Sequence, residues 1–206
     1  MIFDRYEHVG LRHNPFAVVD HQSELAEDLF VDRGLAPPPP PGSSTLVQLI
    51  GAKGMGKTTH VHHWRRAAPG PYHYVPFEPY RQRWSRPPIG PIVYADEIDR
   101  MPHLVRSNWF RRAAAARSTL VAGTHVDLEL QAQRSGLAVV AHHLGPVDRE
   151  TLAVMVDRRL CLAALSPDGD RFAFSAVELE QVLARSRGVL RIAEGLCHEL
   201  LAEHVR

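Results

Sequence analysis

Residues 51–58 are the stretch that most constrains the fold of this chain. They read Gly-Ala-Lys-Gly-Met-Gly-Lys-Thr and match the pattern G-x-x-x-x-G-K-[ST] at every fixed position. A short apolar run, residues 46–50, precedes them, and a sequence typical of a helix begins near Thr58. A strand, a glycine-rich loop and a helix in this order are the context in which the pattern forms a phosphate-binding P-loop. A glycine-rich turn that matches the pattern by chance is the alternative.

The chemistry of a P-loop explains why these residue types are needed. Glycines allow backbone conformations that a side chain would forbid, so successive N–H groups can point inward around an anion. The following helix adds the positive end of its dipole. Lys57 would reach the β- and γ-phosphates of a nucleotide, and the Thr58 hydroxyl would ligate Mg²⁺. The residues expected to bind nucleotide are Gly51, Ala52, Lys53, Gly54, Met55, Gly56, Lys57, Thr58 and Thr59.

The lysine content of the chain supports this interpretation. Lysine and arginine together number 24, and Lys53 and Lys57 are the only two lysines. Both lie inside the loop. Because arginine supplies nearly all the other positive charge, a lysine at the motif position is not a by-product of a lysine-rich composition.

Length and composition limit the class of protein. A chain of 206 residues suits one α/β domain with a small accessory subdomain. The formal net charge of +1 indicates no overall field for nucleic acid or membrane, although local arginine patches leave nucleic acid open as a partner. Cys161 and Cys197 lie far apart, which favours buried thiols over a disulfide. No signal peptide or membrane-spanning run is evident, so we expect a cytoplasmic protein.

Hydrophobic periodicity predicts two regions, with a boundary near residue 146. Residues 1–146 are expected to form an α/β domain, and residues 147–206 a small helical subdomain. The strands are expected at 46–50, 72–77, 89–95, 119–122 and 137–142, and the helices at 58–67, 101–117, 127–134, 148–165, 175–187 and 189–204. Residues 78–88 are few for a helical crossover, so either this connection is abbreviated or the second strand is an edge strand.

An acidic pair, Asp96 and Glu97, ends the third predicted strand. Asp96 would hold Mg²⁺ together with Thr58. Glu97 would polarise a water molecule for in-line attack on the γ-phosphorus. A solvated turn is the alternative for two acids at a strand end. A group that orients water favours a hydrolase over a kinase, which instead positions an acceptor hydroxyl.

Three further polar residues are candidates for contacts with the phosphates. Thr124 ends the next strand, where it could touch the γ-phosphate or the attacking water, and His125 is the neighbouring option. Arg191 opens the last helix and could reach the phosphates from the helical subdomain. A turn threonine and an exposed arginine are the ordinary alternatives.

Residues 80–86 mix arginines with aromatic residues, as single-strand nucleic-acid binders do, although a solvated loop is the simpler interpretation.

Together these features resemble the AAA+ P-loop ATPases, and most of all the replication-initiator, transposition-helper and STAND branch. Residues 51–58 resemble Walker A, residues 92–97 resemble Walker B, Thr124 resembles sensor 1 and residues 188–191 resemble the G-x-x-R of sensor 2. The resemblance implies a parallel sheet of order 5-1-4-3-2 with helices on both faces, followed by a C-terminal helical lid. Nucleotide would lie between the lid and the C-terminal edge of the sheet. Arg134 occupies the approximate place of an arginine finger, which acts on a neighbouring subunit.

The resemblance also implies roles for the segments before the P-loop. Residues 14–16 and 30–33 would help to enclose adenine. Asp32 and Gly34 depart from the F-x-G-R-E pattern of the family, and residues 78–88 are unusually short for it.

The sequence therefore predicts a protein that binds ATP and Mg²⁺ and hydrolyses ATP to ADP. Its nucleotide state would drive lid movement and the binding of a protein partner or further copies of the chain, with low activity in their absence. Two alternatives remain open at this point: a nucleotide-binding scaffold that does not hydrolyse, and a small P-loop kinase. The absence of a guanine-reading N-K-x-D motif favours ATP over GTP.

Overall fold

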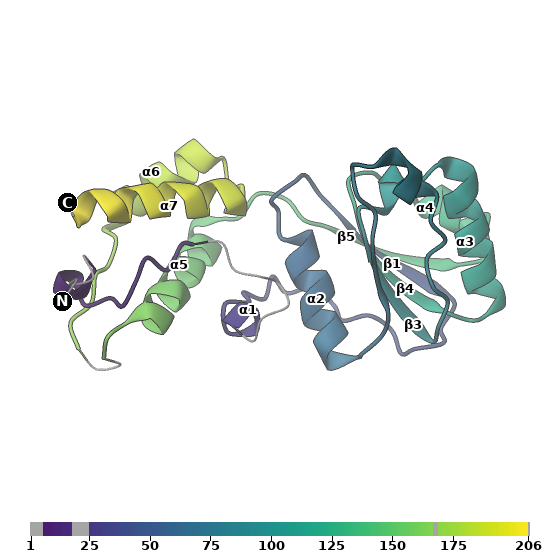
Figure 1. The fold of residues 1–206 in the computed structure, drawn as a ribbon, viewed down its shortest axis with the longest axis horizontal. Helices are drawn as coiled ribbons and strands as arrows, with labels where there is room; N and C mark the ends of the chain where they lie inside the picture. The colour runs from purple at the N-terminus through teal and green to yellow at the C-terminus, as the bar shows by residue number, and fades with distance from the viewer. Residues whose placement is uncertain (1–5, 18–24, 167–168, 206) are drawn as a thin grey trace. The chain divides into compact units, whose positions relative to one another are not determined.

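The computed structural model describes residues 6–17, 25–166 and 169–205. The chain forms two compact units, Gly34–Leu144 and Met1–Arg33 with Gly145–Arg206. Figure 1 labels helices α1–α7 and strands β1, β3, β4 and β5, and each unit is described by itself. None of the helices in the described residues is both long enough and apolar enough to cross a bilayer.

The unit Gly34–Leu144 is built on a five-stranded parallel sheet. Its strands are β1 (Thr45–Ile50), β2 (Tyr72–Tyr74), β3 (Ile92–Asp96), β4 (Thr119–Thr124) and β5 (Ala138–His143). They lie in the order β2-β3-β4-β1-β5, and every neighbouring pair is parallel. This order confirms the predicted 5-1-4-3-2. The second strand is indeed an edge strand, and a short 3₁₀ helix, η2 (Tyr80–Trp84), lies between β2 and β3 in place of a crossover α-helix.

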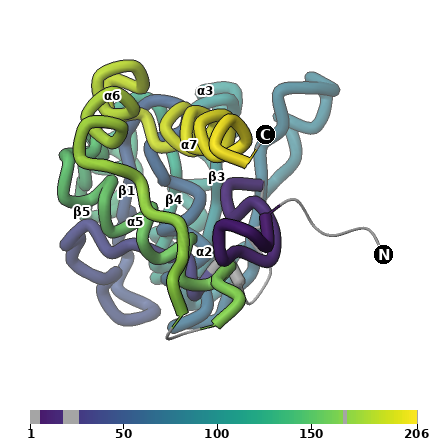
Figure 2. Tube along the Cα trace, turned by 90° about the vertical axis from the view of Figure 1, so that its left-hand side faces the viewer, coloured from purple at the N-terminus to yellow at the C-terminus, as the bar shows by residue number. Residues whose placement is uncertain are grey.

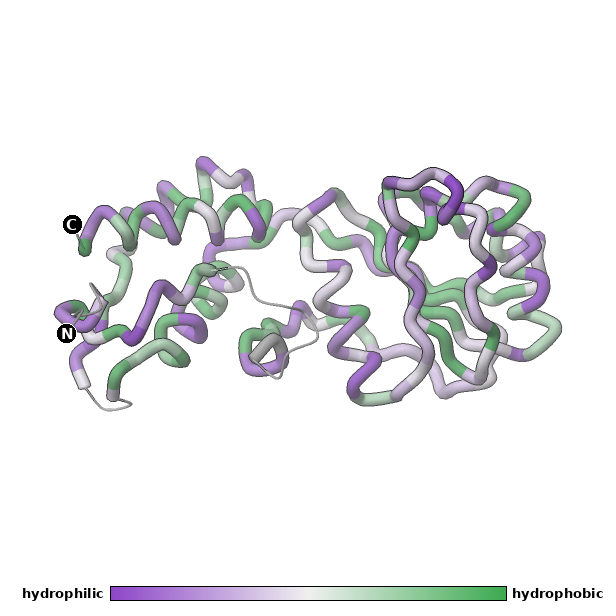
Figure 3. Tube along the Cα trace, in the orientation of Figure 1, coloured by the Kyte–Doolittle hydropathy of each residue, from purple (hydrophilic) through white to green (hydrophobic). Residues whose placement is uncertain are grey.

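Helices cover both faces of the sheet. Figure 1 shows α2 (Lys57–Ala67) on one face and α3 (His103–Ala115) with α4 (Glu129–Gln133) on the other. Strands β1, β3 and β4 are buried at every position because they are covered on both sides, and they appear as mostly hydrophobic segments in Figure 3. Burial on both faces explains why these strands read as continuous apolar runs rather than as alternating ones.

The second unit contains α1 (Leu25–Asp28), α5 (Arg149–Ala163), α6 (Ala176–Ser186) and α7 (Leu190–His204), with a 3₁₀ turn, η1 (Glu7–Val9). Helices α6 and α7 run side by side, as Figures 1 and 2 both show. A capping box is present at the start of α6: the Ser175 hydroxyl accepts from the Glu178 N–H, and the Glu178 carboxylate accepts from the Ser175 N–H at 2.7 Å. Asp148 caps α5 by accepting from the Thr151 N–H at 2.8 Å.

The N-terminal segment packs with these helices, whereas the sequence placed it in the α/β domain. Leu11 and Phe16 belong to the same hydrophobic core as Leu152 of α5 and Cys197 of α7. The Phe16 ring lies edge-on to Phe174, with the ring centroids 5.9 Å apart. The apolar residues of this segment could be buried in the core of either unit. Hydrophobic periodicity along the chain does not indicate which of the two cores they join. The domain boundary near residue 146 itself stays a prediction.

Candidate functional site

The loop between β1 and α2 depends on glycine at three positions. Gly54 and Gly56 have φ angles of 86° and 91°, in the left-handed region that favours glycine. At Gly51, a Cβ atom would lie 2.7 Å from the carbonyl oxygen of Leu144. The loop therefore turns tightly at the C-terminal edge of the sheet, and α2 begins directly after Gly56. The first N–H groups of that helix have no carbonyl partner within it and are free to bind an anion.

Lys57, the motif lysine, is a buried cation held against its own loop. Its Nζ donates to the carbonyl oxygens of Gly51 at 2.7 Å and Ala52 at 3.1 Å. Burial lowers the pKa of Lys57, and the nearby carboxylates of Glu97 and Asp96 oppose this shift. A buried ammonium bonded only to neutral carbonyls suits a site that receives an anionic ligand.

Thr58 and Asp96, the two predicted metal ligands, come together from α2 and β3. The Thr58 hydroxyl donates to Oδ2 of Asp96, and the Glu97 N–H donates to Oδ1 at 3.0 Å. The Asp96 side chain is almost fully buried, and burial raises its pKa while these hydrogen bonds and Lys57 lower it. A hydroxyl and a carboxylate form an oxygen donor set of the kind that Mg²⁺ prefers. The residues present therefore fit the predicted ion.

Sequence reasoning missed Gly123, which makes room for Asp96. A Cβ atom at Gly123 would overlap Oδ1 of Asp96 and approach Cβ of Lys57 to 3.7 Å. Gly123 lies inside β4, on the strand beside β3. A glycine within a strand often marks a close approach of another group, and this was the signal that could have identified it.

Glu97 lies in a cluster of charged residues that the sequence did not predict. Its Oε2 is 2.8 Å from Nη2 of Arg100 and 3.3 Å from Nδ1 of His125. The same His125 nitrogen is 3.3 Å from Oδ2 of Asp99. Ligand atoms of Glu97, Asp99 and His125 lie within 4.8 Å of one another, a spacing that could hold a metal ion. The Arg100 guanidinium, however, already supplies positive charge to this cluster.

Thr124 ends β4 beside the P-loop. Its backbone carbonyl accepts from the Gly51 N–H at 3.2 Å, so the strand end and the loop start are joined. Its hydroxyl donates to the carbonyl of Val126 at 2.9 Å and accepts from the Val126 N–H at 3.2 Å. Both bonds are local, so this hydroxyl holds the turn that follows β4.

Comparisons with known proteins identify the fold. No protein-family model and no curated protein sequence matches the chain. Among solved structures, the Thermotoga maritima RuvB Holliday junction branch migration motor is similar, with a TM-score of 0.52 and 21% identity over 74% of this chain and 53% of that one. The replication initiator DnaA bound to AMPPCP and single-stranded DNA has a TM-score of 0.51 and 12% identity over 79% of this chain and 56% of that one. The chain has the fold of an AAA+ P-loop ATPase. It spans about half the length of the RuvB and DnaA chains it resembles.

The two arginines expected from the AAA+ resemblance belong to elements other than the P-loop and α2. Arg134 is the C-cap residue of α4 and is exposed on a hollow formed with α3. The strand that follows it pairs Ala138 with Thr45, at the start of β1, so Arg134 lies toward the edge of the sheet opposite the P-loop. Arg191 is an exposed residue in the first turn of α7, in the other unit. Their roles as arginine finger and sensor 2 remain predictions.

The glycine of the G-x-x-R sequence has a definite structural role in the helical unit of this AAA+ fold. Gly188 has a φ of 70°, and a Cβ atom there would lie 2.6 Å from Cβ of Pro146. Its carbonyl accepts from the Val147 N–H at 2.9 Å, which ties the α6–α7 turn to the start of α5. Of the segments expected to enclose adenine, residues 14–16 contribute a core residue, because Phe16 is buried against Phe174.

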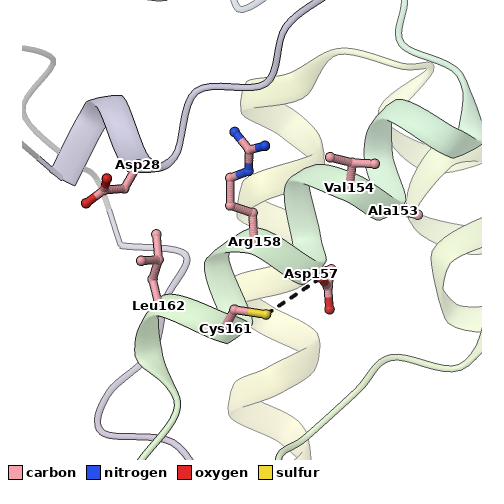
Figure 4. A pocket seen from close by; sticks show the side chains of 7 residues that line it. All are labelled: Asp28, Ala153, Val154, Asp157, Arg158, Cys161 and Leu162. Atoms are coloured by element: carbon pink, nitrogen blue, oxygen red, sulfur yellow. Dashed lines mark hydrogen bonds between the residues drawn. The ribbon is translucent and has the colours of Figure 1, made fainter. Parts of the chain in front are cut away.

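A shallow hollow on α5 is shown in Figure 4. It has a volume of about 670 Å³ and is lined by Asp28, Ala153, Val154, Asp157, Arg158, Cys161 and Leu162. The Arg158 guanidinium donates to the carbonyl of Phe30, and the Cys161 thiol lies 3.6 Å from Oδ2 of Asp157. The lining contains none of the residues predicted to bind nucleotide or metal.

Proposed function

We propose that this chain binds ATP with Mg²⁺ at residues 51–58 and hydrolyses it. The observation that carries the proposal is the meeting of Lys57, Thr58 and Asp96 at the end of β3. A buried ammonium, a hydroxyl and a buried carboxylate there come from an anion-binding loop and the strand that faces it. These groups have little structural reason to be buried together unless a charged ligand uses them.

Each residue has a distinct task in this proposal. Main-chain N–H groups of the loop and the first turn of α2 bind the phosphate oxygens, and Lys57 exchanges its bonds to the loop carbonyls for bonds to phosphate. Thr58 and Asp96 hold Mg²⁺, which neutralises charge on the β- and γ-phosphates when it is bound. Glu97 orients a water molecule and accepts its proton during attack on the γ-phosphorus.

The AAA+ fold also supports a switch in which nucleotide state alters the helical unit and its partners. Arg191 would sense the phosphates from that unit, and Arg134 would act on the nucleotide of a neighbouring copy. An arginine finger supplied by another subunit contributes about 10³–10⁵ in rate, so the isolated chain would hydrolyse slowly. A protein partner or further copies of the chain would complete the site. Since DnaA is described with single-stranded DNA, nucleic acid is a second partner class to test.

The proposal is tested by separating binding from turnover. Glu97→Gln should keep magnesium-dependent ATP binding, measured by calorimetry, and lower the turnover number by about 10²–10⁴, because only proton transfer from water is lost. Lys57→Ala should lose binding itself. Arg112→Gln, which removes an exposed positive charge from α3, should change neither measurement.

The same measurements distinguish the alternative functions. If the folded wild-type chain binds no ATP in the presence of Mg²⁺, the nucleotide-binding proposal fails. Binding without hydrolysis at any protein concentration would identify a nucleotide-binding scaffold. Transfer of the γ-phosphate to a small acceptor instead of water would identify a kinase.

A further inference from the structure

We propose that Arg100 is a positioning residue that restrains Glu97 and links it to exposed rings at the edge of the sheet. This inference rests on the proposed function, because it assigns a role to the arginine that contacts the proposed catalytic carboxylate. Arg100 ends the 3₁₀ helix η3 (Ile98–Arg100), which directly follows β3 and Glu97.

Arg100 is bound at both ends of its guanidinium. Nη2 lies 2.8 Å from Oε2 of Glu97. Nη1 donates to the carbonyl of Val75 at 3.1 Å and to the hydroxyl of Tyr74 at 3.2 Å. A planar fork with several N–H groups can span two partners in this way, whereas a lysine would reach only one of them at a time. The guanidinium therefore connects Glu97 with β2, the edge strand.

This contact limits what Glu97 can do. The Glu97 oxygen forms this ion pair without a hydrogen bond, since its buried Oε2 has no hydrogen-bond partner among the described residues. A carboxylate drawn toward a guanidinium is drawn away from a water molecule at the γ-phosphate. His125 approaches the same oxygen to 3.3 Å, and its Nδ1 forms a hydrogen bond with Oδ2 of Asp99. Glu97 also has a φ of 61°, in the left-handed region, and its backbone is thus held in an uncommon conformation. The arrangement keeps the Glu97 carboxylate paired with Arg100, and away from the attacking water, until Arg100 moves.

The far side of Arg100 lies against exposed aromatic rings. Its guanidinium carbon is 6.0 Å from the centre of the Tyr74 ring and 5.9 Å from that of Phe77. These rings are 49% and 66% exposed. A second arginine, Arg83, also lies over these aromatic residues. Its guanidinium carbon is 4.9 Å from the centre of the Phe77 ring and 4.8 Å from that of Tyr80. The exposed residues Tyr74 and Phe77 therefore border the arginine that pairs with Glu97.

The activity test uses a gain rather than a loss. Arg100→Gln should raise the rate of ATP hydrolysis about threefold to tenfold, which corresponds to losing one partly buried ion pair. KM should change less than about twofold, because Arg100 makes no bond to the P-loop. The hydrolysis rate of Arg100→Lys should fall between those of the wild type and Arg100→Gln, since lysine keeps the positive charge but not the planar guanidinium. Arg83→Gln is the matched control: it removes the other guanidinium from the Phe77 ring without touching Glu97, and should leave the rate unchanged.

A second readout requires no nucleotide. In isotope-labelled protein, the guanidinium NMR signals of Arg100 should shift when Glu97 is changed to Gln, and those of Arg83 should not. A Tyr74→Phe change should shift the Arg100 signals as well, because it deletes one acceptor of Nη1.

The outcomes separate this inference from the proposed function. Unchanged Arg100 signals in Glu97→Gln would overturn the restraint even if the chain proves to be an active ATPase. So would hydrolysis by Arg100→Gln that is equal to or slower than wild type while ATP binding persists. Loss of ATP binding in every form of the protein would overturn the proposed function, and the NMR comparison would still decide whether Arg100 holds Glu97.

Discussion

At the scale of single residues, the candidate site is shaped as much by absent side chains as by present ones. Gly51 leaves space for the carbonyl of Leu144, and Gly123 leaves space for the carboxylate of Asp96. The charged residues then occupy a small volume in which burial shifts the pKa of Lys57 down and that of Asp96 up. Both shifts disfavour the charged forms, and a bound Mg²⁺–nucleotide would reverse that penalty.

A single methyl group at Gly123 should therefore disable the site. In Gly123→Ala the new Cβ overlaps Oδ1 of Asp96, which accepts from the Glu97 N–H. The carboxylate must therefore shift, which also disturbs the bond between its Oδ2 and Thr58. We expect magnesium-dependent ATP affinity to fall at least about tenfold, or roughly 1.4 kcal/mol, as measured by calorimetry. Gly90→Ala is the control, because its Cβ would meet no atom closer than 3.7 Å. Equal affinities for the two variants would contradict the role given to Gly123.

At the scale of elements, helix starts are the features that local sequence encodes most directly. Asp148 caps α5, and Ser175 forms a capping box with Glu178 at the start of α6, at residue types that commonly begin helices. Helix α2 begins directly after Gly56 with no side-chain cap, as α3, α4 and α7 also lack one. What sets α2 apart is the glycine-rich loop before it, with positive φ angles at Gly54 and Gly56.

Ser175→Ala should weaken the start of α6. We expect a loss of about 1 kcal/mol in the free energy of unfolding of the helical unit at pH 7. The Ser175 hydroxyl, and then His204, lower the pKa of Glu178. A carboxylate whose pKa is lower in the folded state stabilises above its unfolded pKa, about 4.3, and that contribution is lost as pH falls through the folded value.

The difference between wild type and Ser175→Ala should thus shrink as the pH is lowered from about 5 to 3. Urea unfolding at a series of pH values measures it. Ser166→Ala is a control, because Ser166 is an exposed residue outside the helices. A difference that stays constant across this pH range would contradict the contribution of Glu178.

At the scale of the whole molecule, the chain has two units, each with its own hydrophobic core. All three tryptophans, Trp64, Trp84 and Trp109, belong to Gly34–Leu144. Cys197 lies in the core of the other unit, where burial raises the pKa of its thiol to about 12. Tryptophan fluorescence and thiol labelling therefore report on different units of the same protein.

Phe16→Ala should destabilise the helical unit although it changes a residue near the N-terminus. Deleting a buried phenylalanine side chain costs about 3–5 kcal/mol. We expect faster labelling of Cys197 by a thiol reagent, at an unchanged midpoint of the tryptophan transition in urea. Cys161→Ser in both proteins removes the exposed thiol from the signal. Leu104→Ala, at a position 77% exposed, should leave both measurements as in the wild type. If Phe16→Ala moved the tryptophan midpoint and not the labelling rate, the segment would belong to the other core.

Much of the fold could be predicted because its signals are local. The buried strands read as apolar runs, the caps and turn residues fall at helix ends, and the motif at 51–58 requires a strand before it and a helix after it. The ends of the observed strands and helices differ from the predicted ones by a few residues, as at β2, where only Tyr72–Tyr74 of the predicted 72–77 pairs with β3. Pairing at an edge depends on the neighbouring strand, so the sequence of β2 alone could not set its length.

By itself, the sequence determined which residues could bind a phosphate and a metal, because backbone freedom at glycine and the chemistry of lysine, threonine and aspartate are properties of the residues. Only the tertiary structure decided which other residues contact them. Gly123 beside Asp96, Arg100 between Glu97 and Tyr74, and Phe16 in the core of the C-terminal helices join residues that are distant in the chain or lie on different elements. Such contacts form because apolar surface is buried and buried charges are paired in three dimensions. Hydrophobic periodicity along the chain does not show which distant residues will meet.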